Sequence, residues 1–441
     1  MIKTGKSTLM NSLVQQYIVP TAVEVLTYSV NWFHHVSFSP NKNECVVVHF
    51  LDGAEEVYKI EALDQFVKYT SDNKEYLDKI HWVDVFIDNP LLLEFDLIDT
   101  PGLSSLVGEE SQHTRDLLVK DENRPDAIIY LMKKGIKKSD INAVREFHEA
   151  TGLMSGINTV AVLSRVDELN NGFDDAQDII NDNILSHSEI KFYFSRVFPI
   201  SALMAEASVN LTHDNINVLL SLADKDDIDD YLLNSSKFVD ETPYFDKSQR
   251  IELIKYLSIS GVRLVISALR YSDEVPANNL RAYLYAYSHV EQVKHFLIQH
   301  FGQRAEFLRA QKAILAVKQK CTECSRSTTI IGSDRKQLLE VMRRMDLFLS
   351  SFEEEFASYY ILSDYYNMKD YFDDEIWERA KQVLGEYGES DKARFGPNSV
   401  SSREEIIKLE KQFWLNTSYS YSIMSNPKGA IVARKISELI K

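Results

Sequence analysis

The feature that most constrains the fold of this chain is the tetrapeptide Gly5-Lys6-Ser7-Thr8 near its start. It matches the second half of the phosphate-binding loop G-x-x-x-x-G-K-[ST], in which a tight turn leads into a helix. An apolar stripe at helical spacing follows over residues 9–14. Backbone N–H groups at the start of such a helix bind phosphate oxygens, and the lysine adds a positive charge. The tetrapeptide therefore predicts a nucleotide-binding α/β fold.

The loop is incomplete on its amino-terminal side. Its first glycine would lie one residue before Met1, and the strand that feeds the loop would precede that glycine. We therefore expect a sheet whose first strand is missing and whose strand edges are exposed. We also expect the chain to be a fragment, or to start at a misplaced codon, and to bind its nucleotide weakly.

A strand-like run over residues 91–98 ends in Asp-Thr-Pro-Gly at 99–102. A carboxylate at the end of a strand suits a water-mediated contact with Mg²⁺, and Asp99 stands in that place. Gly102 lets a backbone N–H approach the γ-phosphate without a Cβ in the way. A plain strand-to-turn junction is the alternative, because Pro-Gly is a common turn pair. The Gly-Lys-Ser motif upstream favours the nucleotide site.

Two further elements follow in the order that a GTPase requires. An apolar run leads to Ser-Arg-Val-Asp at 164–167, where GTPases have [NT]-K-x-D. Asp167 supplies the carboxylate that accepts hydrogen bonds from guanine N1 and N2. Arg165 replaces the usual lysine, and its planar guanidinium can still pack over the base. Ser201-Ala202, after another short strand, is the pair expected near guanine O6.

These four elements resemble those of the dynamin-like GTPases, especially the bacterial branch, over residues 1–205. The long interval before Asp99 contains strand-like segments at 45–51, 56–60 and 81–88, which is similar to the enlarged GTPase domain of that family. The resemblance implies a doubly wound mixed α/β sheet in this domain, with GTP and Mg²⁺ as its ligands.

The resemblance also implies roles for single residues. The nucleotide would be bound by residues of the four motifs: Gly5, Lys6, Ser7, Thr8, Asp99, Gly102, Arg165, Asp167, Ser201 and Ala202. Mg²⁺ would be bound by Ser7, Asp99 and a switch threonine that closes over the γ-phosphate. Thr27 is the first candidate for this threonine and Thr21 the second. A threonine present for its β propensity is the alternative.

In guanylate-binding relatives, an arginine directly before T-G-K-S acts as a catalytic finger in cis. Lys3 occupies that position here, and its charge would offset the charge that develops on the transferring phosphoryl group. Dynamins proper have a serine at this place, so an alternative is that Lys3 has no catalytic role.

Composition narrows the classes of function. The net charge of −17 argues against a nucleic-acid partner, and so against a translation-type GTPase that acts on RNA. Three cysteines are too few for a disulfide scaffold, which favours a reducing, cytoplasmic location. Cys321 and Cys324 form a single CxxC with no second pair, and an inert surface pair is favoured over a metal site. The sequence contains no apolar run long enough to span a bilayer.

Residues 206–441 contain few prolines and glycines, and apolar residues recur there at helical spacing, as along 280–301. This pattern predicts an all-α bundle or stalk domain. The segments 261–264 and 307–313 are similar to the helical half of mycobacterial drug-inducible dynamin-like proteins. The segment 325–336 joins two helical stretches and combines Ile330 and Ile331 with flanking cations, so it is the candidate for peripheral membrane contact at the inner face of the cell membrane. A plain helix-hairpin loop is the alternative.

Two functions from different classes remain open. The first is a GTP-hydrolysing mechanoenzyme that forms homo- or hetero-oligomers through its GTPase domains and remodels a membrane. The second is a structural or regulatory partner with a degraded nucleotide site, which pairs with an intact dynamin-like relative.

Overall fold

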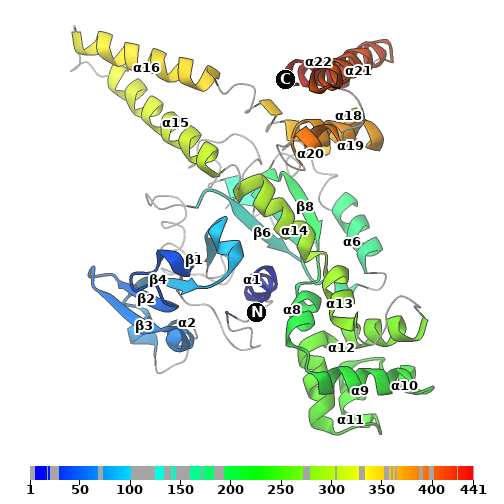
Figure 1. Ribbon diagram of the computed structural model, residues 1–441. Coiled ribbons are helices and arrows are strands. Elements are labelled where there is room, and N and C mark those ends of the chain that lie inside the picture. Colours follow the sequence, from blue (N-terminus) through cyan, green and yellow to red (C-terminus); the bar gives the residue numbers. More distant parts are fainter. Residues whose placement is uncertain are drawn as a thin grey trace.

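The computed structural model (Figure 1) contains α/β and all-α parts. It describes the following residues, and the structural statements below concern these alone: 5–16, 18–19, 29–67, 73–100, 125–133, 141–142, 144–145, 159–169, 172–182, 193–271, 279–302, 305–326, 333–351, 357–358, 361–362, 365–386, 391–396, 402–424 and 426–440.

A five-stranded mixed sheet forms the first part of the chain, in the order β3-β2-β4-β1-β5. Its strands are β1 (Asn31–His35), β2 (Cys45–Phe50), β3 (Glu55–Lys59), β4 (Ile80–Ile87) and β5 (Leu97–Asp99). β1 runs parallel to β4 and antiparallel to β5, while β2 is antiparallel to both of its neighbours. The predicted strands before Asp99 are therefore confirmed as β2, β3 and β4, and β1 is a strand that the sequence pattern did not indicate.

A three-stranded sheet of parallel strands follows, in the order β6-β7-β8. Its strands are β6 (Ile128–Met132), β7 (Thr159–Leu163) and β8 (Arg196–Pro199). The central strand β7 reads Thr-Val-Ala-Val-Leu and is buried along its whole length. Continuous apolar strands of this kind belong to parallel sheets that are covered on both faces. The predicted doubly wound mixed sheet is thus confirmed.

One hydrophobic core serves both sheets. The helix α1 (Lys6–Val14) places its apolar side chains in this core, together with residues of β2, β4 and β7. A second helix, α14 (Val290–Leu297), adds Val290 and Val293 to the same core and contacts α1. In Figure 1, α14 is drawn over the three-stranded sheet, and α1 is drawn below that sheet and beside the five-stranded one. No strand pairing joins the sheets within the described ranges.

Helices that follow β8 form a separate core. They are α8 (Ala202–Asn210), α9 (His213–Ala223), α10 (Ile228–Tyr231), α11 (Ser235–Glu241), α12 (Lys247–Tyr271) and α13 (Leu280–Ser288). Within α12, Ser258 has a φ of +59°, which breaks the helix into two pieces. The helix α8 packs against α13 and also against α1, so this core is attached directly to the phosphate-loop helix.

The remaining helices complete the helix-rich half that the sequence predicts. They are α15 (Ala305–Arg326), α16 (Ser333–Ser351), α18 (Tyr365–Tyr371), α19 (Asp374–Val383), α20 (Asp391–Phe395), α21 (Arg403–Ile423) and α22 (Pro427–Leu439). The last five surround a third core that contains the buried indoles of Trp377 and Trp414. The predicted domain boundary at residue 205 stays a prediction. The helix α14 lies after this boundary in sequence, but its side chains belong to the core of the two sheets.

Candidate functional site

The predicted phosphate-binding residues lie at the start of α1. Gly5 precedes the helix with a φ of +89°, the left-handed region that favours glycine, and no described atom lies within 4 Å of the place where a Cβ would be. Lys6, Ser7 and Thr8 are partly exposed, and the first turn contains no acidic side chain. The helix dipole and the free N–H groups of this turn are therefore available to an anion.

Asp99 ends β5, and its side chain is buried. The strand that carries it contacts α1, so the predicted Mg²⁺ residue and the phosphate-loop helix lie on adjacent elements. Magnesium is a hard cation that takes oxygen ligands and keeps several waters. The Ser7 hydroxyl and the Asp99 carboxylate fit that preference. No cluster of three or more His, Cys, Asp or Glu residues that could hold a metal occurs among the residues that the structure describes.

The two motifs that the sequence predicts to recognise the base come together around Asp167. This residue follows β7, is largely buried, and accepts a hydrogen bond from the Ser201 hydroxyl, which follows β8. Backbone bonds hold both loops, since Val166 N–H donates to Ile200 O at 3.2 Å and Ser164 N–H donates to Met132 O at 2.8 Å. Motifs that are 34 residues apart in sequence thus form one site.

The charge of Asp167 depends on two opposing effects. Burial raises the pKa of its carboxyl group, and the hydrogen bond from Ser201 lowers it. Ser201 is itself fully buried and caps α8 by accepting from Met204 N–H at 3.4 Å. An anchored carboxylate at the mouth of a parallel sheet is suited to accept two N–H donors from a purine edge.

Arg165 adopts a left-handed backbone conformation, with a φ of +63°, and its side chain is partly exposed. Its guanidinium pairs with Glu168 at 2.6 Å. Its predicted position over the base stays a prediction, as does the position of Ser201-Ala202 near guanine O6. Ala202 is buried as the first residue of α8.

Several predicted residues lie outside the described ranges. These are Lys3, Gly102 and both switch candidates, Thr21 and Thr27. The finger, the γ-phosphate contact and the third Mg²⁺ ligand therefore remain predictions from the sequence.

Asn11 is a buried polar residue on the helix that begins with the predicted phosphate-binding residues, and the sequence pattern did not reveal its role. It is buried on α1, and its amide accepts from the N–H groups of Ile18 and Val19 at 3.0 and 2.8 Å. It donates to Val19 O at 2.9 Å and to Glu206 of α8 at 3.1 Å. Asn11 thus fixes the chain that leaves α1 toward the predicted switch threonines. Its only signal in the sequence is a polar residue inside an apolar stripe.

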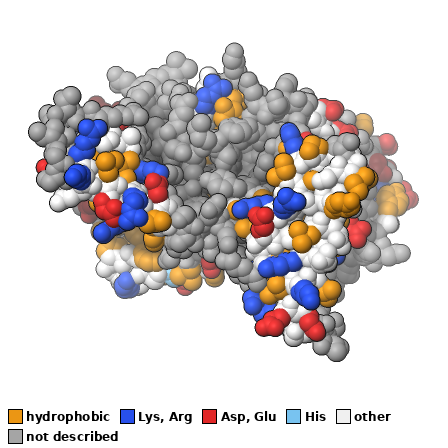
Figure 2. Space-filling model, turned by 90° about the horizontal axis from the view of Figure 1, so that it is seen from above, with side chains coloured by type: hydrophobic (Ala, Val, Ile, Leu, Met, Phe, Trp, Pro, Cys, Tyr) orange, Lys and Arg blue, Asp and Glu red, His pale blue; other side chains and the backbone are white. Residues whose placement is uncertain are grey.

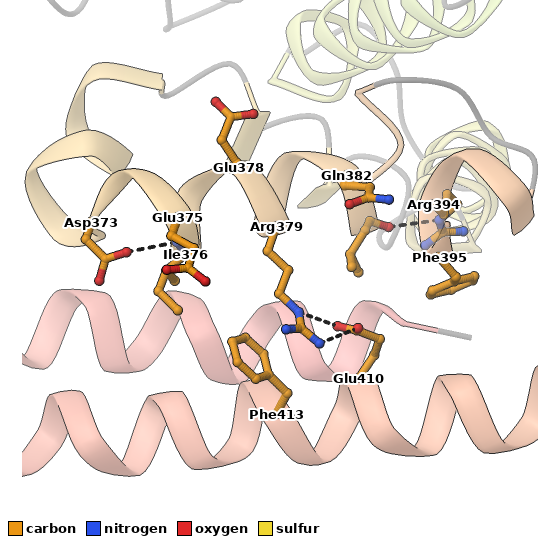
Figure 3. Close-up of a pocket in the computed structure, with 11 residues that line it drawn as sticks. Asp373, Glu375, Ile376, Glu378, Arg379, Gln382, Arg394, Phe395, Glu410 and Phe413 are labelled. Atoms are coloured by element: carbon orange, nitrogen blue, oxygen red, sulfur yellow. Dashed lines mark hydrogen bonds and ion pairs between the residues drawn. The ribbon is translucent and has the colours of Figure 1, made fainter. Parts of the chain in front are cut away.

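A separate groove of about 510 Å³ lies between α19, α20 and α21 (Figure 3). Figure 3 shows Arg379 reaching down to Glu410, with the two bonds at 3.1 and 2.6 Å, and its guanidinium lies 3.7 Å from the centre of the Phe413 ring. Arg394 donates to Val383 O at 2.8 Å. These charges bind the three helices to one another, and the groove contains none of the predicted nucleotide-site residues.

Comparison of the amino-acid sequence with known proteins identifies similar proteins. The chain is 26% identical over 423 residues to the isoniazid-induced protein IniC of Mycobacterium tuberculosis, which spans 91% of this chain and 80% of that protein. It is also 26% identical over 220 residues to dynamin-like protein 2 of Campylobacter jejuni, which spans 49% of this chain and 32% of that protein. The first similarity extends through the helical half, as the sequence predicts.

Among solved structures, the chain aligns with one chain of an oligomerised bacterial dynamin pair, with a TM-score of 0.32 and 14% identity. The description of that structure says that the pair provides a mechanism for the long-range sensing and tethering of membranes. That alignment covers 99% of this chain and 82% of the other. The model of the dynamin family matches residues 1–166, which include the phosphate loop, Asp99 and the loop at 164–166. The amino-terminal part of the chain is therefore similar to the dynamin family.

Proposed function

We propose that this protein binds GTP with Mg²⁺ and hydrolyses it, and that hydrolysis drives self-association and membrane remodelling. The observation that carries the proposal is the convergence of Asp167 and Ser201 at the ends of β7 and β8. A buried carboxylate that is anchored in this way suits a guanine edge, and the start of α1 supplies the phosphate site expected with it.

The proposed roles follow from the chemistry of each group. Backbone N–H groups of Gly5 and Lys6 and the Lys6 ammonium group bind the β- and γ-phosphates. Ser7 and Asp99 hold Mg²⁺, directly or through water, and the metal offsets charge on the phosphates. Water attacks the γ-phosphate, so the protein orients and stabilises the reacting groups without forming a covalent bond. Asp167 selects guanine.

Exchanging the base tests the site directly. Asp167→Asn replaces an acceptor by an amide that can donate to the 2-oxo group of xanthine, so GTP affinity is expected to fall and XTP affinity to rise, each by about tenfold or more. Titration calorimetry in the presence of Mg²⁺ measures both nucleotides. Lys6→Ala is expected to weaken both equally. Equal GTP affinity of the wild type and Asp167→Asn would contradict guanine recognition.

Phosphate release separates the two classes of function. A mechanoenzyme releases phosphate from GTP in a reaction that Lys6→Ala abolishes. Selective GTP binding by the wild type without turnover, alone and after mixing with an intact dynamin-like relative, would favour the regulatory partner. Sedimentation with GTP, with GDP and without nucleotide tests whether self-association follows the nucleotide state.

The proposed membrane contact is at the end of the α15–α16 pair. The two helices lie side by side, with Lys318 paired to Asp346. Figure 1 shows the end of α15 and the start of α16 at the upper left, away from the sheets. Of the segment 325–336, residues 327–332 lie outside the described ranges. None of the described helices is long and apolar enough to cross a bilayer, so the proposed contact is peripheral.

A second exposed surface serves as a comparison. Seen from above, basic and hydrophobic side chains are interspersed over the lobe where α21 and α22 lie (Figure 2). Tyr419, Ile423 and Ile431 are exposed there, and residues 411–437 contain no acidic side chain. In co-sedimentation with anionic liposomes, Ile330→Asp/Ile331→Asp is expected to lose binding, and Tyr419→Asp/Ile423→Asp to retain it. The reverse result would move the contact to α21–α22.

A further inference from the structure

The junction between α13 and α14 adjoins the base-recognition loops. The apolar spacing of 280–301 suggests one continuous helix, but His289 has a φ of +57° and separates the two helices. α13 packs on α8, and α14 enters the core that contains α1. The residues at the break, Tyr287, Ser288 and His289, are therefore held from both sides.

The first contact of the junction is with the residue that anchors Asp167. Ser201 N–H donates to the carbonyl oxygen of Ser288 at 3.0 Å. Ser201 and Ser288 are both fully buried, and the Ser201 hydroxyl donates to the Asp167 carboxylate. A displacement of the junction would therefore displace the donor that orients Asp167.

The second contact is with the chain that follows Asp167. The ring of Phe173 stacks on His289 at 3.8 Å and meets Tyr287 edge-on at 5.2 Å. A Cβ on Gly172, whose φ is +57°, would lie 3.0 Å from the Tyr287 hydroxyl oxygen. The junction thus contacts both the loop that contains Ser201 and the chain that follows Asp167.

Electrostatics support the same placement. Burial lowers the pKa of His289, so its ring stacks on Phe173 in the neutral form. Burial raises the pKa of Tyr287, and the negative charge of Asp167 contributes to that rise. Tyr287 is therefore within electrostatic reach of the carboxylate that is proposed to bind the base.

We propose that the α13–α14 junction positions the base-recognition carboxylate, so that occupancy of the base pocket by guanine is coupled to the arrangement of α13 and α14. This inference rests on the proposed function. Coupling between two sites is reciprocal: if the junction sets base affinity, then the bound base stabilises the junction. Tyr287, Ser288 and His289 are thus positioning residues that act through Asp167 and Ser201.

The ratio of GTP to ITP affinity tests the proposal, because ITP lacks the 2-amino group that would donate to Asp167. Phe173→Leu removes the ring that contacts the junction, and GTP affinity is expected to fall about tenfold while ITP affinity changes less than about threefold. Phe173→Tyr keeps the ring and is expected to restore the ratio. Phe245→Leu, the same change at an exposed position before α12, is the matched control, and its ratio is expected to equal that of the wild type.

A second variant and a second measurement keep the proposal testable if Phe173→Leu does not fold. His289→Asn preserves a residue that tolerates the left-handed backbone but removes the stacked ring, so it is expected to lower the ratio as Phe173→Leu does. In the wild type, GDP is expected to slow hydrogen exchange at amides 287–290. An unchanged GTP-to-ITP ratio in both variants, or unchanged exchange at these amides, would overturn the coupling. A wild type that does not distinguish GTP from ITP would instead contradict the proposed function itself.

Discussion

At the scale of single residues, the proposed recognition of guanine by Asp167 is expected to depend on pH. Its pKa is raised by burial, against the opposing bond from Ser201, so its carboxyl group takes up a proton at a higher pH than an exposed aspartate does. A protonated carboxyl cannot accept from both guanine N–H groups. We expect GTP affinity to fall on acidification, over the pH range in which the protein stays folded, beginning at a higher pH than the titration of an exposed aspartate would give.

Calorimetry with Asp167→Asn provides the control for this pH dependence. The variant keeps the titration of the nucleotide phosphates but has no carboxyl group at the base. Its affinity for XTP is expected to change with pH only as the phosphates do. Parallel pH profiles for the wild type with GTP and the variant with XTP would show that Asp167 remains ionised over this range.

Asn11 is a structural residue whose loss should be costly. Asn11→Leu preserves the approximate volume but leaves the N–H groups of Ile18 and Val19 without their acceptor. A buried donor without a partner costs about 1–3 kcal/mol, so the free energy of unfolding is expected to fall by about 2 kcal/mol or more in urea titration. Asn416→Leu, at an exposed position of α21, is the control, and an equal effect of both changes would contradict this role.

Sequence spacing was sufficient to predict Asp99, Asp167 and Ser201 as site residues, because each stands at the end of an apolar strand or shortly after one. It was not sufficient to find the bonds between them. The hydrogen bond from Ser201 to Asp167 and the stack of His289 on Phe173 join positions far apart in the chain. Their proximity depends on how β7, β8 and α13 pack, and no local pattern records it.

At the scale of elements, a network of histidines and carboxylates joins the strands of the five-stranded sheet. His34 on β1 contacts Asp84 of β4 at 3.3 Å and Asp96, just before β5, at 3.0 Å. Asp84 also contacts His49 of β2 at 2.8 Å. Burial alone would lower the pKa of His34, but its bonds to Asp84 and Asp96 outweigh burial and raise it from 6.5 to about 9.

This network predicts a pH-dependent stability. Since the folded pKa of His34 lies above the unfolded value, its contribution is fully present below pH 6.5 and is lost as the pH rises through about 9. The melting temperature is expected to fall between these values, and the fall should be smaller in His34→Gln. His213→Gln, at an exposed position of α9, should follow the wild type. A slope in His34→Gln equal to that of the wild type would exclude this source.

Element types were predictable where hydrophobic periodicity was strong, as for the run that became β7. The strand β1, Asn-Trp-Phe-His-His, was not predicted from the sequence, because its alternation is interrupted by polar residues such as His34, which pairs with Asp84 on the neighbouring strand β4. The break between α13 and α14 was also not predicted from the sequence, for the opposite reason. Apolar spacing continues through it, and only packing against two different cores requires the left-handed His289.

At the scale of the whole molecule, two ion pairs connect the three-stranded sheet region to the later helices. Arg196 of β8 pairs with Glu386, which follows α19, and both side chains are largely buried. The guanidinium of Arg196 also lies 5.2 Å from the ring centre of Phe296 on α14. Arg309 of α15 pairs with Asp126 at 3.1 Å, but that arginine is mostly exposed. The first pair therefore holds the third core to the nucleotide-binding part, and the second contributes less.

The two ion pairs predict different losses of stability when each is broken. Glu386→Gln removes the carboxylate that pairs with the largely buried Arg196, and this loss is expected to cost about 2 kcal/mol and to speed hydrogen exchange in α19. Asp126→Asn opens a more exposed pair and is expected to cost less than about 1 kcal/mol. A double-mutant cycle with Arg196→Gln isolates the coupling energy from other losses. If Glu386→Gln and Asp126→Asn had equal effects, the contact at β8 would be only a surface pair, and the helices of the third core would be held to the sheet by apolar packing instead.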